Sequence, residues 1–341
     1  MSAALSIGSM VSARSLQDVP RLRYVVVPPK AQPDFRTAAL EGLAGEQKTI
    51  PSRFLYDEVG SALFEAITRL HEYYLTRKER SILQSHAGSI ISAVGKRIEM
   101  VEFGSGSAEK TRLLLEAALV NQKELRFVPI DISQAALQSS AVNLLNEHAG
   151  LDVVAIAAEY RDALHSLPTP NAPRLLLFLG SNIGNFTPLD AQSFLAGVAK
   201  QMGPDDRLLV GIDLVKDPAI IELAYNDPAG VTAAFNRNLL SRVNRELGGQ
   251  FDLDGFAHRA PFLPDQNKVE MRLVAQCNQW VRIGGMKGSM RFKRGEYIHT
   301  EDSHKYSLEG FEEIAHGSGL SLVDRWIDEE KWFALTLLRR P

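Results

Sequence analysis

The feature that most constrains the fold is a strand that breaks at two glycines and turns directly into a helix. It occupies residues 98–112, with the sequence IEMVEFGSGSAEKTR. The apolar run ends at Gly104 and Gly106, and a helix-forming segment starts at Ala108. Such a turn brings backbone N–H groups and the positive end of a helix to one point beside a sheet. The sequence therefore predicts that a nucleotide-like ligand binds at this turn.

Acidic residues around the turn indicate which ligand it suits. A dinucleotide fingerprint requires G-x-G-x-x-G, and Glu109 stands where its third glycine would be. Glu102 precedes the first glycine, and a second apolar run ends in Asp131, where a carboxylate can accept both hydroxyls of a ribose. S-adenosylmethionine (SAM) has no pyrophosphate, and its cationic groups tolerate a nearby acid, so SAM fits this pattern better than NAD does. A structural turn in an unrelated α/β sheet is the alternative.

Composition argues against several classes of protein. The chain has 341 residues, 45% hydrophobic and 23% charged, which suits a soluble protein with a large core and either two domains or one domain with a sizeable insertion. Its net charge of −3, without a long basic block, argues against binding nucleic acid. Cys277 is the only cysteine, which predicts a reducing compartment and no intrachain disulfide. We see no apolar run of the roughly 18 residues that a membrane helix needs and no signal peptide, so we expect a cytoplasmic protein that binds no membrane.

The order of apolar and helical segments predicts an α/β fold, because continuous apolar strands that alternate with helices are typical of a parallel sheet covered on both faces. The predicted strands are 98–103, 125–130, 152–157, 174–179 and 207–213, with helices at 108–119, 133–147 and 188–201. After Asp213 two helices precede antiparallel-looking strands between residues 256 and 293. The alternation resumes with a helix at 308–317 and strands at 321–327 and 332–338.

Two other stretches concentrate polar groups. The fourth strand runs into GSNIGNF, residues 180–186, which by the rule for open α/β sheets lies at the carboxyl edge, near the glycine turn. A plain strand-to-helix turn is the other interpretation of this loop. Tyr56, Tyr73 and Tyr74 bracket a short predicted helix. They are either core side chains with hydroxyls at the surface or part of a site.

These stretches resemble the histidine-specific N-alpha-methyltransferases of ergothioneine biosynthesis, a class I SAM-dependent family. The resemblance covers nearly the whole chain from about Pro51 and rests on several long motifs in the same order. They are FLYDEVGS, ITRLHEYYLTR, EFGSGSAEKTR, FLGSNIGNF, DLVKD, DPAGVTAAFNRN, KVEMRL and TEDS. The resemblance implies a Rossmann-like parallel sheet with a second α+β lid domain.

Resemblance and segment order together predict three regions. Residues 1–20 form a flexible N-terminal tail. Residues 21–75 and 216–305 form the lid, which binds the substrate. Residues 76–215 and 306–341 form the SAM-binding domain.

The resemblance also implies which residues bind the amino-acid substrate. They are Tyr56, Tyr73, Gly180, Asn182, Asn185, Tyr225, Met271, Glu301 and Ser303. Asn185 and Tyr225 would hold the carboxylate, whereas Glu301 and Ser303 would hydrogen-bond the imidazole. Tyr56 falls where a tyrosine hydroxyl lies beside the amine that is methylated, so we expect Tyr56 and Asn185 to be the catalytic pair.

For the cofactor, the resemblance implies SAM, which leaves as S-adenosylhomocysteine. The SAM-binding residues would be Glu102, Gly104, Ser105, Gly106, Lys110, Asp131, Glu159 and Tyr160. The chain departs from the family at two places. Where relatives have Gly-Asp-Phe beside the adenine, this chain has Ala158, Glu159 and Tyr160, which puts the carboxylate on a longer arm. Asn182 replaces a threonine of some relatives near the substrate amine, where it could change how far methylation proceeds.

The expected chemistry needs few special groups. Methyl transfer from a sulfonium is an in-line displacement that mainly requires positioning and the exclusion of water. An α-amine with a pKa of roughly 8 loses its proton without a strong base, so the lack of a Ser-His-Asp or metal constellation is no objection. His299 and His304 flank Glu301 and Asp302, but their spacing matches no helical metal site, so we expect no metal.

We therefore predict a SAM-dependent N-methyltransferase that acts, as a monomer, on the α-amine of L-histidine and gives Nα-trimethylhistidine (hercynine). Glu301 against an imidazole N–H favours histidine over tryptophan, because a site built to pair a polar group rejects substrates that lack it. Three alternatives stay open. One is methylation of another aromatic or imidazole amino acid, such as tryptophan or a thiohistidine, or of a ring nitrogen. The others are a nucleotide-dependent dehydrogenase and a SAM-binding regulatory protein without turnover.

Overall fold

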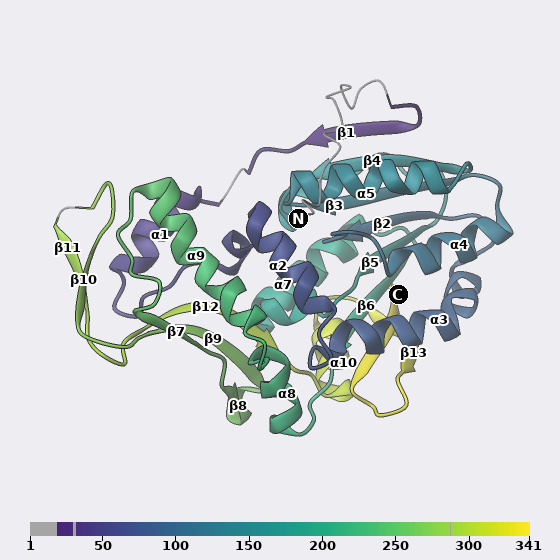
Figure 1. Cartoon of the computed structure of the whole chain (residues 1–341). Coiled ribbons are helices and arrows are strands. Elements are labelled where there is room, and N and C mark those ends of the chain that lie inside the picture. The colour runs from purple at the N-terminus through teal and green to yellow at the C-terminus, as the bar shows by residue number, and fades with distance from the viewer. Residues whose placement is uncertain (1–18, 30–31, 287) are drawn as a thin grey trace, which may run out of the picture.

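The centre of the molecule is an eight-stranded sheet in the order β1-β4-β3-β2-β5-β6-β14-β13 (Figure 1). The computed structural model describes residues 19–29, 32–286 and 288–341. The strands are β1 (Leu22–Val26), β2 (Glu99–Phe103), β3 (Leu125–Asp131), β4 (Leu151–Ala157), β5 (Arg174–Phe178), β6 (Arg207–Asp213), β13 (Ser321–Ile327) and β14 (Phe333–Arg339). Strands β1 to β6 run parallel, whereas β14 runs antiparallel to both β6 and β13. The predicted α/β class, with a mostly parallel Rossmann-like sheet, is confirmed.

Helices cover both faces of this sheet because its central strands are apolar on both sides. The helices are α3 (Tyr74–Val94), α4 (Thr111–Asn121) and α5 (Gln134–Glu147) on one face, and α6 (Tyr160–Ala163), α7 (Pro188–Gln201) and α10 (Leu308–Gly317) on the other. Successive side chains of β2 point into different cores: Met100 belongs to the same core as Leu115 of α4, and Val101 to the same core as Phe194 of α7.

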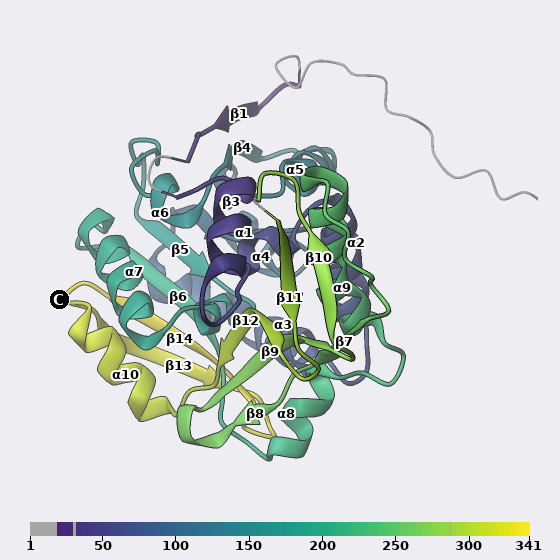
Figure 2. The same cartoon turned by 90° about the vertical axis from the view of Figure 1, so that its left-hand side faces the viewer.

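A second lobe is built from the N-terminal segment and the insertion after β6. Its elements are α1 (Phe35–Ala44), α2 (Glu58–Thr68), α8 (Pro218–Tyr225), α9 (Val231–Leu247), β7 (Phe256–Arg259), β8 (Phe262–Leu263), β9 (Lys268–Ala275), β10 (Gln279–Arg282), β11 (Ser289–Phe292) and β12 (Tyr297–His304). β9 pairs antiparallel with β12 and with β7, and β10 and β11 form a separate two-stranded sheet. Figure 1 shows this lobe to the left of the central sheet, and Figure 2 shows it from its own side.

Contacts between residues that are far apart in the sequence hold the second lobe together. The His299 N–H donates to the Lys48 carbonyl at 2.8 Å, and the Ile50 N–H donates to the His299 carbonyl at 3.0 Å. Asp57 starts α2 by accepting from the Gly60 N–H at 2.8 Å, and the same carboxylate oxygen accepts from the Asn238 amide of α9 at 2.7 Å. The N-cap of α2 therefore also fixes α2 against α9.

Strand β1 lies in a different place from the one expected. Residues 21–75 were expected to belong to the lid, yet Leu22–Val26 pairs in parallel with β4 at the edge of the central sheet. The Arg21 guanidinium donates to the carbonyl oxygens of several residues around the turn before β4, including Leu151 at 2.7 Å. A short apolar run does not reveal which sheet edge its backbone will pair with. Of the predicted N-terminal tail, residues 1–18 lie outside the described residues.

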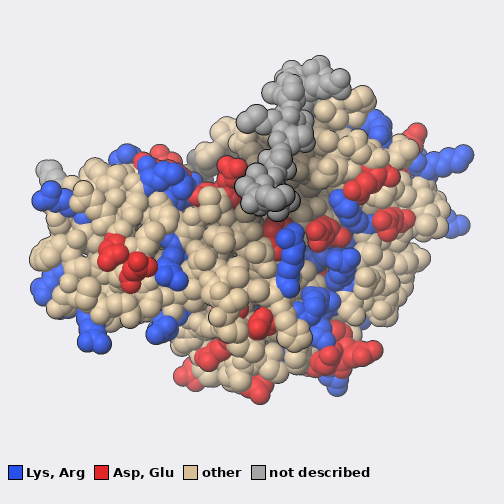
Figure 3. Space-filling view, viewed as in Figure 1, with Lys and Arg blue, Asp and Glu red and all other residues tan. Residues whose placement is uncertain are grey.

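Two observations concern membranes and charged partners. None of the helices in the described ranges is long and apolar enough to cross a membrane. On the face shown in Figure 3, the Lys and Arg side chains are interspersed with Asp and Glu side chains.

Candidate active site

The order of the strands reverses between β2 and β5, because β3 and β4 extend the sheet on one side and β6 extends it on the other. In an open α/β sheet, ligands bind in the crevice at such a reversal, outside the carboxyl ends of the strands. The glycine turn after β2 and the loop that starts at Gly180 after β5 both border this point. The fold therefore brings together the two loops that the sequence analysis selected.

The glycine turn depends on the absence of a side chain. Gly104 has a φ of 75° and Gly106 a φ of 48°, values that L side chains rarely adopt. A Cβ atom on Gly104 would lie 2.7 Å from Tyr160 Oη and 2.8 Å from Asn182 Nδ2. Glycine at this position thus lets the loops after β4 and β5 close on the turn. Ser181, with a φ of 57°, begins the 3₁₀ turn Asn182–Asn185 in the second of these loops.

An outer cleft runs along the carboxyl edge of β2, β3 and β4. The predicted cofactor residues that line it are Gly104, Gly106, Asp131, Glu159 and Tyr160. Asp131 Oδ2 accepts from the Gly106 N–H and Oδ1 from the Ser133 N–H, both at 2.8 Å. Burial raises the pKa of Asp131, while these backbone donors lower it in part. The carboxylate is therefore held by the backbone at the tip of β3, where a ribose would meet it.

An ion pair between the two lobes lies in the wall of the outer cleft. Arg53 Nε lies 3.4 Å from Glu159 Oε1, and both side chains line the cleft. Burial raises the pKa of Glu159, and the Arg53 guanidinium opposes that shift. The longer arm of Glu159 thus contacts a cation of the second lobe in this structure.

Three predicted cofactor residues do not line the outer cleft. Glu102 and Ser105 are buried at the turn, and Lys110 pairs with the fully buried carboxylate of Glu79. Glu102 Oε1 accepts from the Thr111 hydroxyl at 2.5 Å, whereas Glu102 Oε2 and Ser105 Oγ have no hydrogen-bond partner. Buried polar atoms are normally paired, so these two atoms fit a polar, cationic ligand at the turn.

Glu102 is also electrostatically suited to a cation. Burial raises the pKa of Glu102 to about 8, and the Thr111 hydrogen bond and the Lys110 ammonium lower it in part. A ligand cation beside this carboxyl would favour its ionised form. The Glu102 carboxylate and the Ser105 hydroxyl at the turn therefore suit the ammonium group at the amino-acid end of SAM.

An inner cavity adjoins the outer cleft, and every predicted substrate residue lines it. These residues are Tyr56, Tyr73, Gly180, Asn182, Asn185, Tyr225, Met271, Glu301 and Ser303. They come from both lobes: Glu301 and Ser303 lie on β12, Met271 on β9, and Asn182 and Asn185 on the loop after β5. Glu301 is directly opposite Met271 in the β12–β9 ladder. Of the three bracketing tyrosines, Tyr74 lies outside the cavity, because its hydroxyl donates to the buried carboxylate of Asp213.

The inner cavity and the outer cleft share part of their walls. The side chains of Tyr56, Phe64, Asn182 and Asn185 line both. Tyr56 packs edge-on against Phe64, with ring centroids 5.4 Å apart. Burial raises the pKa of Tyr56, and the nearby Glu301 carboxylate adds to the shift, so its hydroxyl stays protonated. A ligand in the cleft and a ligand in the cavity would thus meet beside uncharged side chains.

Glu301 is the carboxylate of the inner cavity. It is 8% exposed, and burial raises its pKa to about 8. The Lys305 ammonium and the Asn185 amide lower this pKa in part, and Asp302 raises it. A donor ligand such as a ring N–H would stabilise the ionised form, which can only accept hydrogen bonds.

Buried charges that the sequence motifs did not predict lie behind the cavity. Lys305 Nζ lies 2.8 Å from Asp213 Oδ2, and neither side chain is exposed. Lys216 Nζ lies 2.5 Å from Asp213 Oδ1. Lys216 lies within the motif DLVKD, and Lys305 follows the motif TEDS by two positions. Neither motif indicates which residue its lysine pairs with.

Within the described residues, one group of possible metal ligands comes together, and cations already occupy it. The group is Glu270, His299 and Asp302. Lys268 Nζ lies 3.0 Å from Asp302 Oδ2 and 3.3 Å from Glu270 Oε2, while Arg272 Nε lies 2.7 Å from Glu270 Oε1. These lysine and arginine side chains neutralise the carboxylates without a metal ion.

Comparisons with known proteins lead to the same chemistry. A family model described as histidine-specific methyltransferase, SAM-dependent, matches residues 35–340. The chain is 42% identical over 299 residues to the histidine N-alpha-methyltransferase of Mycolicibacterium smegmatis, covering 88% of this chain and 92% of that protein. Its identity to the histidine N-alpha-methyltransferase of Mycobacterium tuberculosis is 40% over 303 residues, covering 89% of this chain and 94% of that protein. Ergothioneine biosynthesis protein 1 of Neurospora crassa is 31% identical over 296 residues, covering 82% of this chain and 32% of that protein.

Proposed function

Because the chain belongs to the family of histidine-specific, SAM-dependent methyltransferases, we propose that it methylates the α-amine of L-histidine three times. The product is then Nα-trimethylhistidine (hercynine), and the pathway is that of ergothioneine. The observation that carries this proposal is the shared wall of the two cavities at Tyr56, Asn182 and Asn185. A methyl donor in the outer cleft and an amine in the inner cavity would face each other at this wall.

On the cofactor side, the outer cleft would hold SAM, which supplies an electrophilic methyl group. Asp131 would accept the ribose hydroxyls at the tip of β3, and Glu159 and Tyr160 would border the adenine. Glu102 and Ser105 would act on the amino-acid end from beneath the glycine turn, which is supported by their unpaired buried oxygens. Lys110 would act indirectly, through its ion pair with Glu79.

On the substrate side, the inner cavity would hold histidine between two polar ends. Glu301 and Ser303 would bind the imidazole from β12, and the Asn185 amide would bind the carboxylate. Tyr225, which was expected at the carboxylate as well, would instead support Ser303, because its hydroxyl lies 2.8 Å from Ser303 Oγ and 2.8 Å from Lys305 Nζ. Tyr73 and Met271 complete the wall, with the Tyr73 ring centroid 6.2 Å from that of Tyr225. This arrangement leaves the α-amine on the side of the shared wall.

The residues at the shared wall suit methyl transfer by positioning. The amine must be neutral to attack, and its own pKa of roughly 8 allows this without a strong base. Tyr56 and Asn185 are uncharged hydrogen-bonding groups, so they orient the amine without placing a cation beside the sulfonium. Phe64 and the ring of Tyr56 help to exclude water, so that the two reactants stay in attack geometry.

We extend the proposal to the assembly and location of the enzyme. The second lobe, without β1, would act as a lid over the outer cleft, a role supported by the Arg53–Glu159 ion pair between the lobes. A monomer would suffice, because one chain supplies all the residues that line both cavities. A cytoplasmic enzyme would suit a chain with a single cysteine.

Incubation of the protein with SAM and a panel of amino acids, read by mass spectrometry, tests the proposed function. We expect L-histidine to gain three methyl groups and tryptophan to react much more slowly. The panel should include Nα-methylhistidine and Nα,Nα-dimethylhistidine, because both would be intermediates. Methylation of tryptophan or a thiohistidine in preference to histidine would overturn the assignment of the substrate.

A further inference from the structure

A buried lysine lies directly behind the proposed imidazole site. Glu301, Ser303 and Lys305 occupy alternate positions along β12 and its extension, so their side chains lie on one face of the strand. The Lys305 N–H continues the ladder by donating to the Asn267 carbonyl at 2.6 Å. The Lys305 side chain is 0% exposed, and it lies outside the set of residues that line either cavity. The ammonium therefore reaches a ligand only through the groups that it contacts, apart from the electrostatic effect of its charge on Glu301.

The Lys305 ammonium has three partners. Its Nζ lies 2.8 Å from Asp213 Oδ2, 2.8 Å from Tyr225 Oη and 2.9 Å from Ser303 Oγ. An ammonium has three donors and no acceptor, so all three oxygens accept from it. The cation is retained in the interior because Asp213, which also pairs with Lys216, is itself fully buried. Both hydroxyls of this cluster thus have one lone pair occupied by Lys305.

The two hydroxyls also bond to each other. Tyr225 Oη lies 2.8 Å from Ser303 Oγ. A phenol is the more acidic of the two hydroxyls, with a pKa of about 10, and is the better donor. With Tyr225 as the donor, Ser303 accepts from both Tyr225 and Lys305, and both of its lone pairs are occupied. Ser303 can then only donate, and its O–H is the one proton of the cluster that remains for a ligand.

We propose that Lys305 is a positioning residue that fixes Ser303 as a hydrogen-bond donor to the unprotonated ring nitrogen of the substrate. This inference rests on the proposed function. A neutral imidazole has one N–H, which can donate to Glu301, and one bare nitrogen, which can accept from Ser303. An imidazolium has two N–H groups and would leave the Ser303 proton facing another donor. Lys305 thereby makes the site selective for a neutral azole ring.

The two isomers of pyrrolylalanine test this role, because each replaces one ring nitrogen of histidine by C–H and keeps the other as N–H. We would measure kcat/KM for L-histidine and for both isomers with the unmodified chain, Lys305→Met and Lys216→Met. The unmodified chain should favour histidine over the better isomer by at least about tenfold, because a buried donor without an acceptor is costly. In Lys305→Met the Ser303 hydroxyl can donate to Tyr225 instead, so this preference should fall to about threefold or less.

Lys216→Met is the matched control, because Lys216 also pairs with Asp213 but contacts neither Ser303 nor Tyr225 in the hydrogen bonds described. It should keep the preference of the unmodified chain. General damage to the fold lowers both rates equally and leaves their ratio unchanged. A Lys305→Met enzyme with the original preference, or a Lys216→Met enzyme that loses it to the same extent, would overturn the inference.

Should Lys305→Met fail to fold, Lys305→Gln gives the same readout. Its amide can still donate to Asp213, while its amide oxygen can accept the Ser303 proton, so the preference for histidine should again fall. An unchanged preference in Lys305→Gln would count against the inference. If the unmodified chain does not methylate histidine at all, the proposed function fails first, and the inference fails with it.

Discussion

The carboxylate of Glu79 accepts a hydrogen bond from the backbone N–H of Gly180 at 2.8 Å, across 101 positions of sequence. Glu79 lies on α3, is fully buried and also pairs with Lys110, which precedes α4. One carboxylate thus fixes the loop after β5 relative to the helix that follows the glycine turn. These are the two walls of the crevice at which we place SAM and histidine.

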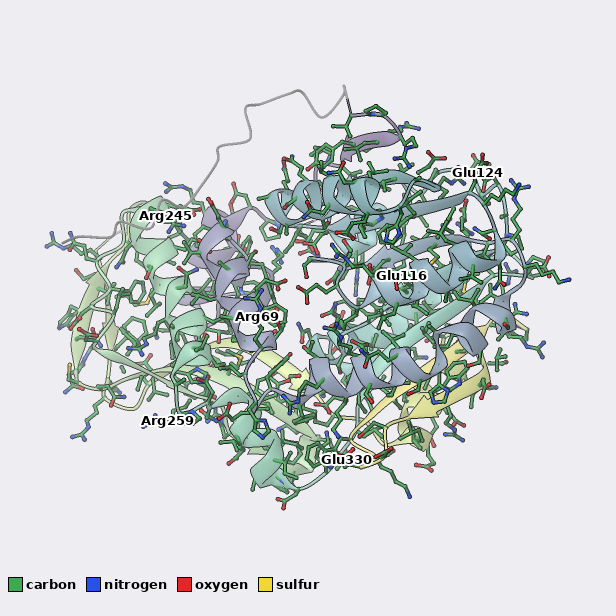
Figure 4. All side chains as sticks on the ribbon, turned by 45° about the vertical axis from the view of Figure 1, so that its right-hand side comes forward. Arg69, Glu116, Glu124, Arg245, Arg259 and Glu330 are labelled. Atoms are coloured by element: carbon green, nitrogen blue, oxygen red, sulfur yellow. The ribbon has the colours of Figure 1, made fainter. Side chains whose placement is uncertain are left out.

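Replacement of Glu79 should loosen both walls. Glu79→Gln keeps the size of the side chain but leaves the Lys110 ammonium without its counter-ion, so we expect the free energy of unfolding to fall by about 3 kcal/mol. The Kd for SAM should rise about tenfold, as the turn and the loop lose their common anchor. Urea denaturation and calorimetry measure the two quantities. Glu116→Gln, at an exposed position of α4 (Figure 4), should change stability by less than about 0.5 kcal/mol. Equal effects of the two substitutions would contradict this role for Glu79.

SAM binding should release a proton from Glu102. Burial raises the pKa of Glu102 to about 8, so most of this carboxyl is protonated at neutral pH in the free protein. A cationic ligand at the turn favours the ionised form, and we expect the release of up to about one proton per SAM bound near pH 7. Calorimetry in two buffers of different ionisation enthalpy counts these protons. Glu102→Gln should release none from this position, and equal proton counts for both chains would assign the proton to another group.

Stability should depend on pH through Glu301. Burial raises its pKa to about 8, whereas a glutamate in an unfolded chain has a pKa of about 4.3. Between these values the folded chain keeps a proton that the unfolded chain releases, so this group lowers the free energy of unfolding as pH rises. Glu301→Gln cannot titrate, and it should gain stability relative to the parent chain by up to about 1.4 kcal/mol per pH unit. Urea denaturation from about pH 5 to about pH 8 tests this sign. A difference between the two chains that does not vary with pH would refute it.

Substrate preference should depend on the same carboxylate. Glu301→Ala removes the acceptor for the imidazole N–H, so kcat/KM for histidine should fall about 100-fold. The value for tryptophan should change by less than about threefold, because its indole N–H lies on a larger ring and at a different position. Asp302→Ala is the control, because the neighbouring carboxylate pairs with Lys268 and His299 instead of lining the cavity. It should leave the preference for histidine intact. Steady-state kinetics with both amino acids would reveal a wrong pocket assignment as an unchanged rate for histidine.

Much of the fold could be predicted because the signal is local. Continuous apolar runs such as residues 174–178 and 207–213 belong to buried parallel strands, and the glycine turn between β2 and α4 follows directly from residues 103–111. The position of β1 could not be predicted in this way. Its place at the sheet edge depends on backbone pairing with β4 and on the contacts of Arg21, which a five-residue apolar run does not encode.

The residues of the inner cavity could be selected from long motifs, whereas their supporting charges could not. Glu301 and Ser303 belong to the motif TEDS, but Lys305 becomes relevant only because the fold brings β12 beside the end of β6. Glu79 likewise acquires its role from a contact with a loop about a hundred positions away. A buried ion pair between distant segments is a property of the tertiary structure, and neither partner has a local pattern that identifies the other.

The central claim is that the methyl group of SAM is transferred to the α-nitrogen of histidine. Reaction of ¹³C-methyl-labelled SAM with histidine labelled with ¹⁵N only at the α-nitrogen, followed by NMR spectroscopy of the product, tests it most directly. We predict a one-bond coupling between the new methyl carbons and the labelled nitrogen. Methyl signals without this coupling, which would place the transfer on a ring nitrogen, or no transfer to histidine, would contradict the account.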